Sequence, residues 1–164
     1  MTKVAIFIGS ISDKDIMQPC ADILKDLGIP HLYTVTSAHR TPQRTEKLIA
    51  QLEADGCQVF ICAAGMAAHL AGAVAARTTK PVLGVPINAS PLGGMDALLA
   101  TVQMPPGFPV GTLALDKAGA RNAAWMAAQI LALTDKGLEE KIKKARDKFA
   151  DGVKKAAKEL ESGK

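Results

Sequence analysis

Lys3-Val-Ala-Ile-Phe-Ile-Gly-Ser-Ile-Ser-Asp13 is a short apolar run followed by a glycine and small polar residues. The β-branched and aromatic residues before Gly9 favour a strand, and the residues after it favour a turn that leads into a helix. Short apolar runs of this kind alternate along the chain with longer segments of helical periodicity. This alternation is typical of βαβ units on a parallel sheet.

The pattern predicts an α/β protein with a flavodoxin-like, three-layer α/β/α architecture. Its five-stranded parallel sheet has the strand order 2-1-3-4-5, and a C-terminal helix follows. The predicted strands are Lys3–Ile8, His31–Thr36, Gln58–Ala63, Pro81–Ile87 and Pro109–Leu115. The predicted helices span about 13–27, 42–55, 67–77, 94–101, 118–133 and 135–161.

Residues with strong backbone preferences support several helix boundaries. Thr41 is suited to be an N-cap with Pro42 at the first helical position, and Gly28 and Gly56 are suited to end helices. Pro19 interrupts the first predicted helix because it cannot donate to the Asp15 carbonyl, so we expect a kink or a late start there.

Length and composition predict one domain, residues 1–164, with a core at 3–134 and a helical extension at 135–164. The chain has 164 residues, of which 48% are apolar and 22% charged, and this excludes a disordered, collagenous or coiled-coil protein. Residues 1–134 carry 10 basic and 9 acidic side chains, and residues 135–164 carry 10 and 7. Most of the excess positive charge therefore lies on the extension, and the 4% aromatic content gives little support for nucleic-acid binding.

Cysteines and apolar segments indicate a soluble cytoplasmic protein. Cys20, Cys57 and Cys62 show no CxxC spacing and are expected to be reduced core residues. We predict no signal peptide, no contact with a membrane and no metal site.

The predicted C-terminal helix carries one apolar stripe, although the five-stranded body already has helices for both faces of its sheet. We interpret the stripe as a surface that packs against another subunit. It consists of Leu138, Ile142, Ala145, Phe149, Val153 and Leu160.

In a parallel sheet, ligands bind beyond the carboxyl ends of the strands, so the loops after the strands are the candidate site. Ser10 and Ser12 lie at a helix N-terminus, where free N–H groups favour a phosphate, although either serine could simply cap the helix. Asp13 suits the hydroxyls of a ribose, although it could also be a favourable charge in the first turn of the helix. After the second strand, Ser37 and Ala38 precede His39, a candidate proton-transfer residue, and Arg40, whose fork suits a phosphate or carboxylate.

The third loop, 64–70, has so little side-chain bulk that its backbone could approach a planar ligand. Gly65, Ala68, His69 and Leu70 are candidates here, although close packing with a structural His69 explains the pattern equally well. The loop at 88–94 could be a lid or an ordinary glycine-rich loop. Paired carboxylates, a metal cluster and a nucleophile elbow are all missing from these loops, which favours cofactor-free proton transfer on a phosphorylated small molecule.

Six motifs together resemble the 5-(carboxyamino)imidazole ribonucleotide mutase family of purine biosynthesis, over about residues 3–135. They are Gly9-Ser-Ile-Ser-Asp13, Ser37-Ala-His-Arg-Thr-Pro42, Gly65-Met-Ala-Ala-His-Leu70, Pro81-Val-Leu-Gly-Val-Pro86, Val102-Gln-Met-Pro105 and Pro109-Val-Gly-Thr-Leu113. Met66 departs from the pattern because many relatives have glycine there.

The resemblance implies a flavodoxin-like homo-octamer without a cofactor that moves a carboxylate from N5 to C4 of an aminoimidazole ribonucleotide. It implies His39 as the general acid and base, and Ser10, Asp13 and Arg40 as substrate-binding residues. The weaker binding candidates that it adds are Ser12, Ser37, Ala38, Gly65, Ala68, His69 and Leu70. Transient contact with the synthetase that makes the unstable carbamate is a further expectation.

Two alternatives stand beside this interpretation. A sister branch carboxylates the aminoimidazole directly with CO2, but it carries lysine after the histidine, where this chain has Arg40. A flavodoxin-like nucleotide-binding or signalling module is the other. A phospho-receiver would need an aspartate after the third strand, where the sequence is Ala63-Ala64-Gly65-Met66.

Overall fold

Five parallel strands form one sheet in the order β2-β1-β3-β4-β5 within residues 1–163, the part of the chain described by the computed structural model. This confirms the predicted topology. The strands are β1 Val4–Ile8, β2 His31–Val35, β3 Val59–Gly65, β4 Val82–Ile87 and β5 Gly111–Thr112. The 3-10 helix η1 spans Ile11–Asp13, and the α-helices are α1 Lys14–Asp26, α2 Pro42–Ala54, α3 Leu70–Ala75, α4 Met95–Val102, α5 Asp116–Ala132 and α6 Lys136–Glu161.

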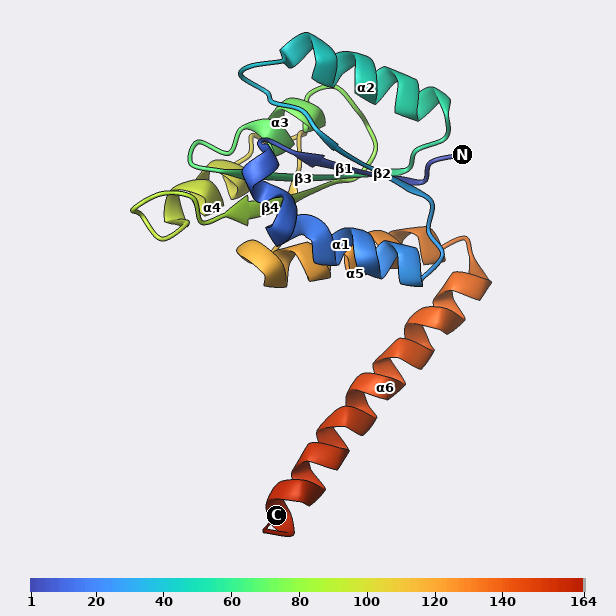
Figure 1. Cartoon of the computed structure of the whole chain (residues 1–164). Coiled ribbons are helices and arrows are strands. Elements are labelled where there is room, and N and C mark those ends of the chain that lie inside the picture. Colours follow the sequence, from blue (N-terminus) through green and yellow to red (C-terminus); the bar gives the residue numbers. More distant parts are fainter. Residues whose placement is uncertain (164) are drawn as a thin grey trace. The chain divides into compact units, whose positions relative to one another are not determined.

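Helices cover both faces of the sheet, as Figure 1 shows for α2 and α3 on one side and α1 and α5 on the other. Alternate strand residues point to opposite faces, so the apolar strands supply two core layers. The layer under α2 and α3 includes Phe7 and Phe60, whose ring centroids lie 5.8 Å apart. It also contains Ala5, Ile49, Leu52, Cys62, Leu70 and Val74.

Register brings the carboxyl ends of neighbouring strands to one edge. Ile8 pairs with Val35 on β2 and with Ala63 on β3, and Ala63 pairs with Val85 on β4. The loops that follow these strands therefore begin beside one another, as predicted for the candidate site.

Two elements are shorter than predicted. The helix expected at 67–77 is only Leu70–Ala75, because Met66 and Ala68 have φ of 55° and 36°, which a right-handed helix cannot contain. The strand expected over Pro109–Leu115 is only Gly111–Thr112. It lies at the sheet edge, its Pro109 has no N–H to donate, and the chain turns toward α5 after Leu113.

Other boundary predictions are confirmed in position. Gly28 and Gly56 follow helices with φ of 74° and 85°. Thr41 precedes α2 with Pro42 at its start, but the Thr41 side chain bonds back to Ser37 instead of capping the helix. Helix α1 runs from Lys14 through Pro19, so it does not start late.

Cys20, Cys57 and Cys62 are free and buried, which agrees with the sequence. Burial raises the pKa of the Cys20 thiol to about 12. No helix within residues 1–163 combines the length and apolar character that crossing a bilayer requires.

The chain divides into two compact units, Met1–Ala127 and the segment from Ala128 onward. In the second unit, Asp135 caps α6 by accepting a hydrogen bond from the Leu138 N–H at 3.0 Å. The predicted stripe is present on α6: Leu138 and Ile142 are buried, whereas Phe149, Val153 and Leu160 are 60–82% exposed.

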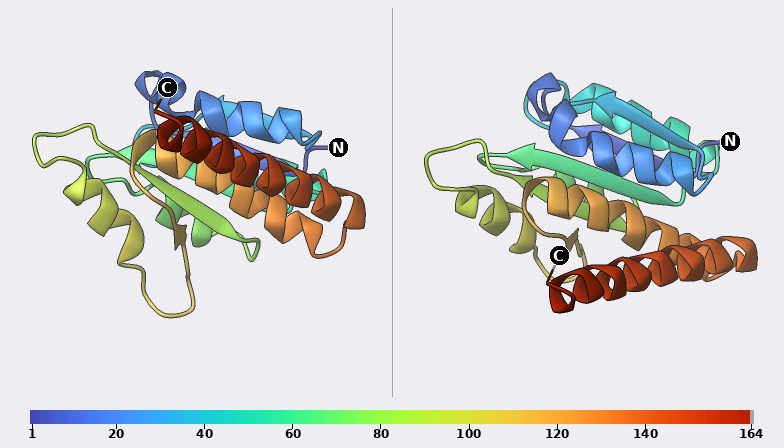
Figure 2. Two further views of the ribbon diagram at one scale, coloured as in Figure 1. Left: turned by 90° about the horizontal axis from the view of Figure 1, so that it is seen from below. Right: turned by 60° about the horizontal axis from the view of Figure 1, so that its bottom comes forward.

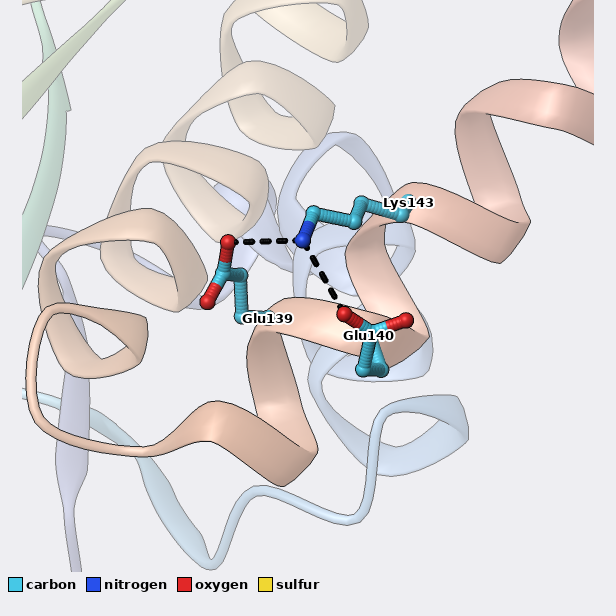
Figure 3. A network of polar contacts seen from close by, with 3 residues as sticks. All are labelled: Glu139, Glu140 and Lys143. Carbon is cyan, nitrogen blue, oxygen red and sulfur yellow. Dashed lines mark hydrogen bonds and ion pairs between the residues drawn. The ribbon is translucent and has the colours of Figure 1, made fainter.

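Charged pairs on the surface of α6 support this long helix. Lys143 Nζ lies 2.8 Å from Glu139 Oε1 and 3.0 Å from Glu140 Oε1. Figure 3 shows the Lys143 side chain pointing toward both carboxylates. Hydrogen bonds to these two carboxylates raise the pKa of the Lys143 ammonium, and the bond to Glu139 has the larger effect. Ion pairs between residues three or four positions apart stabilise a helix modestly. The paired side chains are about half exposed, so these charges lie on a solvated face of α6.

Gly84 on β4 allows close packing between the sheet and α4. A Cβ at this position would collide with Thr101 Cγ2 and lie 2.9 Å from Val110 Cγ1.

We expect Gly84→Ala to lower the free energy of unfolding by about 1–3 kcal/mol through overpacking, measured by urea denaturation. Gly152→Ala is the matched control, because a Cβ there meets nothing within 4 Å and alanine should stabilise helix α6 by about 0.5–1 kcal/mol. Equal stability of Gly84→Ala and the parent would contradict the packing argument.

Candidate functional site

A cavity of about 640 Å³ lies at the carboxyl ends of the strands and contains every residue predicted for the site. Four loops contribute to it, those after β1, β2, β3 and β4. The predicted residues that line it are Ser10, Ser12, Asp13, Ser37, Ala38, His39, Arg40, Gly65, Ala68, His69 and Leu70. Gly9, Ala64, Met66, Ala67 and Ala89 line it as well.

A second cavity, of about 820 Å³, surrounds the amino end of β4 near Arg77, Lys80 and Phe108. It is larger, but it lies at the edge of the sheet where the strands begin. Ligands of parallel sheets bind where the strands end, and the histidine and serine motifs lie there too. We therefore assign the candidate site to the smaller cavity.

The loop after β1 is organised around the carboxylate of Asp13, a residue that is only 6% exposed. Its Oδ2 accepts a hydrogen bond from the Ser10 N–H at 3.2 Å, and its Oδ1 accepts one from the Ser12 hydroxyl at 3.2 Å. Ser10 Oγ in turn accepts from the Ser12 N–H, so Ser10 and Asp13 form a capping box around η1. The expectation that a serine caps this turn is confirmed for Ser10.

Burial raises the pKa of the Asp13 carboxyl above its usual value. The hydrogen bonds from Ser12 and Ser10 and the positive charge of Arg40 oppose this effect but do not cancel it. The hydrogen bonds from Ser10 and Ser12 hold the Asp13 carboxylate in place at the wall of the cavity.

Arg40 links the first two loops, because its Nη2 donates to the Gly9 carbonyl at 3.0 Å. A tight turn positions Arg40 and His39: Thr41 Oγ1 accepts from the Ser37 N–H at 3.0 Å, and Ser37 Oγ accepts from the Arg40 N–H at 3.2 Å. The remaining guanidinium donors of Arg40 suit an anionic group. The sequence predicted Thr41 only as a helix cap, and its role in this turn was missed.

His39 and His69 lie in direct contact across the cavity. His39 Nε2 is 2.6 Å from His69 Nδ1, and the two rings meet edge to face with centroids 4.8 Å apart. One nitrogen must donate and the other accept, so the two rings share a single proton at this contact. The structure thus places His69 beside His39 at the wall of the cavity.

The loop after β3 has an unusual backbone. Met66 and Ala68 lie in the left-handed region, with φ of 55° and 36°, and the Ala68 N–H closes the turn on the Gly65 carbonyl at 3.0 Å. A Cβ on Gly65 would lie 2.6 Å from the Ala89 Cβ, so only glycine fits against the next loop. Met66 has a backbone conformation that suits glycine. The residue is 59% exposed and lines the cavity.

No group of three or more histidine, cysteine or acidic side chains within residues 1–163 is arranged to hold a metal ion. The chemistry that these residues offer is proton transfer at His39 and His69, hydrogen-bond acceptance at Asp13, and anion binding at Arg40.

Comparison with known proteins agrees with this geometry. Residues 3–152 match the family model described as AIR carboxylase. N5-carboxyaminoimidazole ribonucleotide mutase of Escherichia coli K12 is 50% identical over 151 residues, which cover 92% of this chain and 89% of that protein. The protein of the same name from Bacillus subtilis is 44% identical and covers 96% and 97% of the two chains.

A solved structure shares the whole fold. The crystal structure of Treponema denticola PurE aligns with a TM-score of 0.88 and 26% identity, over 98% of this chain and 99% of that chain. The family match covers all four loops that line the cavity. On these grounds, the chain belongs to the AIR carboxylase family.

Proposed function

We propose that the protein is an N5-carboxyaminoimidazole ribonucleotide mutase of purine biosynthesis. The observation that carries this proposal is the placement of His39 in one cavity with Asp13 and Arg40, in a chain that is 50% identical to a protein of that name. The substrate is a phosphorylated ribonucleotide whose exocyclic N5 carries a carboxylate, and the product carries that carboxylate on C4.

Substrate binding uses the first two loops. Asp13 accepts hydrogen bonds from the ribose hydroxyls, and the hydroxyl groups of Ser10 and Ser12 contact the phosphate. Arg40 binds an anionic group of the substrate through the guanidinium donors that do not contact Gly9. The small side chains of Ala38, Gly65 and Ala68 leave space for the planar imidazole. Ser37 positions the turn, and Leu70 closes the apolar base of the cavity.

His39 performs both proton transfers. In the first step the N5–carboxylate bond breaks, CO2 is released into the closed site, and His39 donates a proton to N5. In the second step C4 attacks the CO2 carbon, and the now neutral His39 removes the C4 proton. The steps balance without a net proton change, which explains how one residue can serve as acid and then as base. His69 orients the His39 ring through the shared proton.

Direct carboxylation of the aminoimidazole by CO2 would use the same cavity, as would nucleotide binding by a signalling module of this fold. Arg40 after His39, the Ala68-His69-Leu70 run and the relatives named as mutases favour the mutase reaction.

The substrate is the first test of this proposal. Purified protein should convert the carbamate ribonucleotide to the C4-carboxylate at a rate far above its turnover of aminoimidazole ribonucleotide with bicarbonate, measured by absorbance of the imidazole product. Efficient turnover of only the second pair would make the protein a carboxylase. Turnover of neither would favour the signalling module.

The acid and base role of His39 gives a second prediction. We expect His39→Asn to bind the product with nearly parental affinity, because Arg40 and Asp13 remain. Its kcat should fall by about 10²–10⁴-fold. Calorimetric titration and a steady-state assay measure the two effects.

His31 provides the control for this experiment, and His69 provides a graded comparison. His31 lies at the start of β2 and contacts the Ile29 carbonyl, so His31→Asn should leave kcat unchanged. His69→Leu removes one hydrogen bond to His39 and should lower kcat by about three- to tenfold. Near-parental turnover in His39→Asn would refute the assignment of the base.

We further propose that the protein acts in the cytoplasm as a homo-octamer. Helix α4 exposes Met95, Leu99 and Val102, spaced to form one apolar row, and α6 exposes Phe149, Val153 and Leu160. Apolar rows of this size are typical of subunit interfaces. Transient contact with the synthetase that supplies the unstable carbamate remains a prediction.

Sedimentation velocity tests the assembly. We expect one species of about eight subunits at micromolar concentration, and Leu99→Lys on α4 should yield smaller species because it places a charge in the apolar row. A monomeric parent protein would contradict the proposal.

A further inference from the structure

Asp116, the first residue of α5, has a left-handed backbone conformation. Its φ is 55°, which is strained for residues with a Cβ and easy for glycine. The corner around it is tight, because a Cβ on Gly119 would collide with the Ala114 carbonyl. Aspartate is among the few residues with a Cβ that adopt this conformation, and here its carboxylate also has a hydrogen-bond partner.

The carboxylate of Asp116 holds the loop that leaves β4. Asp116 Oδ1 accepts a hydrogen bond from the Asn88 N–H at 2.9 Å, and Asn88 is the first residue after β4. Asn88 lies beyond the end of β4, so strand pairing does not hold its N–H in place.

The far end of the same loop returns to this point. Gly94 has φ of 82°, and a Cβ on it would lie 2.6 Å from Leu115 Cδ2 and 3.2 Å from Asn88 Cβ. Both ends of the 88–94 loop therefore meet at Leu115 and Asp116. Figure 2 shows this loop extending beyond the sheet between β4 and α4.

The anchored end of the loop forms part of the candidate site. Ala89, next to Asn88, lines the cavity that contains His39 and Arg40. Ala89 also packs so closely on the turn after β3 that only glycine fits at position 65. A shift of Asn88 would move Ala89 and loosen the wall that Ala89 and Gly65 form together.

We propose that Asp116 is a positioning residue for substrate binding, which acts by anchoring the 88–94 loop so that Ala89 closes the cavity against Gly65. This inference rests on the proposed function, because it concerns the same cavity. Asp116 does not line the cavity and is not among the groups that transfer protons. Its effect falls on binding, so KM and the affinity for product change while kcat is nearly constant.

Two substitutions at this position test the proposal. Asp116→Gly removes the acceptor and relieves the backbone strain, so the variant should melt no lower than the parent. We expect its KM for the carbamate ribonucleotide to rise about five- to tenfold, with kcat within about twofold of the parent. Asp116→Asn keeps an acceptor oxygen and tolerates the left-handed conformation, so its KM should stay within about twofold of the parent.

Titration of both variants with the product ribonucleotide provides a measurement independent of turnover. A parental KM and product affinity in Asp116→Gly would overturn the inference, as would an equal rise in KM in both variants. Failure of the parent protein to convert the carbamate would instead overturn the proposed function. Sedimentation of each variant checks that the assembly is unchanged, so that a rise in KM in an intact assembly supports the anchoring role.

Discussion

The pairing of β1 with β2 on one side and β3 on the other is the constraint on which the site depends. Ile8 is in register with both Val35 and Ala63, so the chain leaves all three strands at one edge. The Arg40 side chain can then reach the Gly9 carbonyl across 31 residues of sequence. His39 can likewise reach His69 across 30 residues. A slip of one residue in either pair would turn strand side chains to the opposite face and separate these groups.

Much of this arrangement could be predicted from local sequence. The apolar runs and the turn residues predicted the strand order, and the carboxyl-end rule located the cavity around His39 and Arg40. The contact of His39 with His69 could not be predicted, because it depends on side-chain directions set by two loops far apart in sequence. The short α3 and the anchoring of Asn88 depend on left-handed residues, and the residue types of Met66 and Ala68 carry no signal for that conformation.

The positions of these three residues are informative together. They are the residues other than glycine with left-handed φ within residues 1–163, and all lie at the carboxyl edge of the sheet. Met66 and Ala68 line the cavity, and Asp116 holds its rim through Asn88. For Met66 and Ala68 such a conformation costs about 1–2 kcal/mol each, which the buried sheet core must offset. Strain that gathers at one cavity and is absent from the other turns favours selection for the shape of the site.

The buried carboxylate of Asp13 is a second feature of the cavity that costs stability. Because burial raises its pKa in the folded state, protonated Asp13 stabilises the fold at pH values below the unfolded pKa. That contribution is lost as pH rises through the folded pKa, so at neutral pH the ionised carboxylate opposes folding. An asparagine would avoid this cost at a buried position, yet the chain keeps a carboxylate with Ser12 and Arg40 beside it. A carboxylate that costs stability at working pH and lines the cavity supports the proposal that Asp13 accepts hydrogen bonds from the ribose hydroxyls of the substrate.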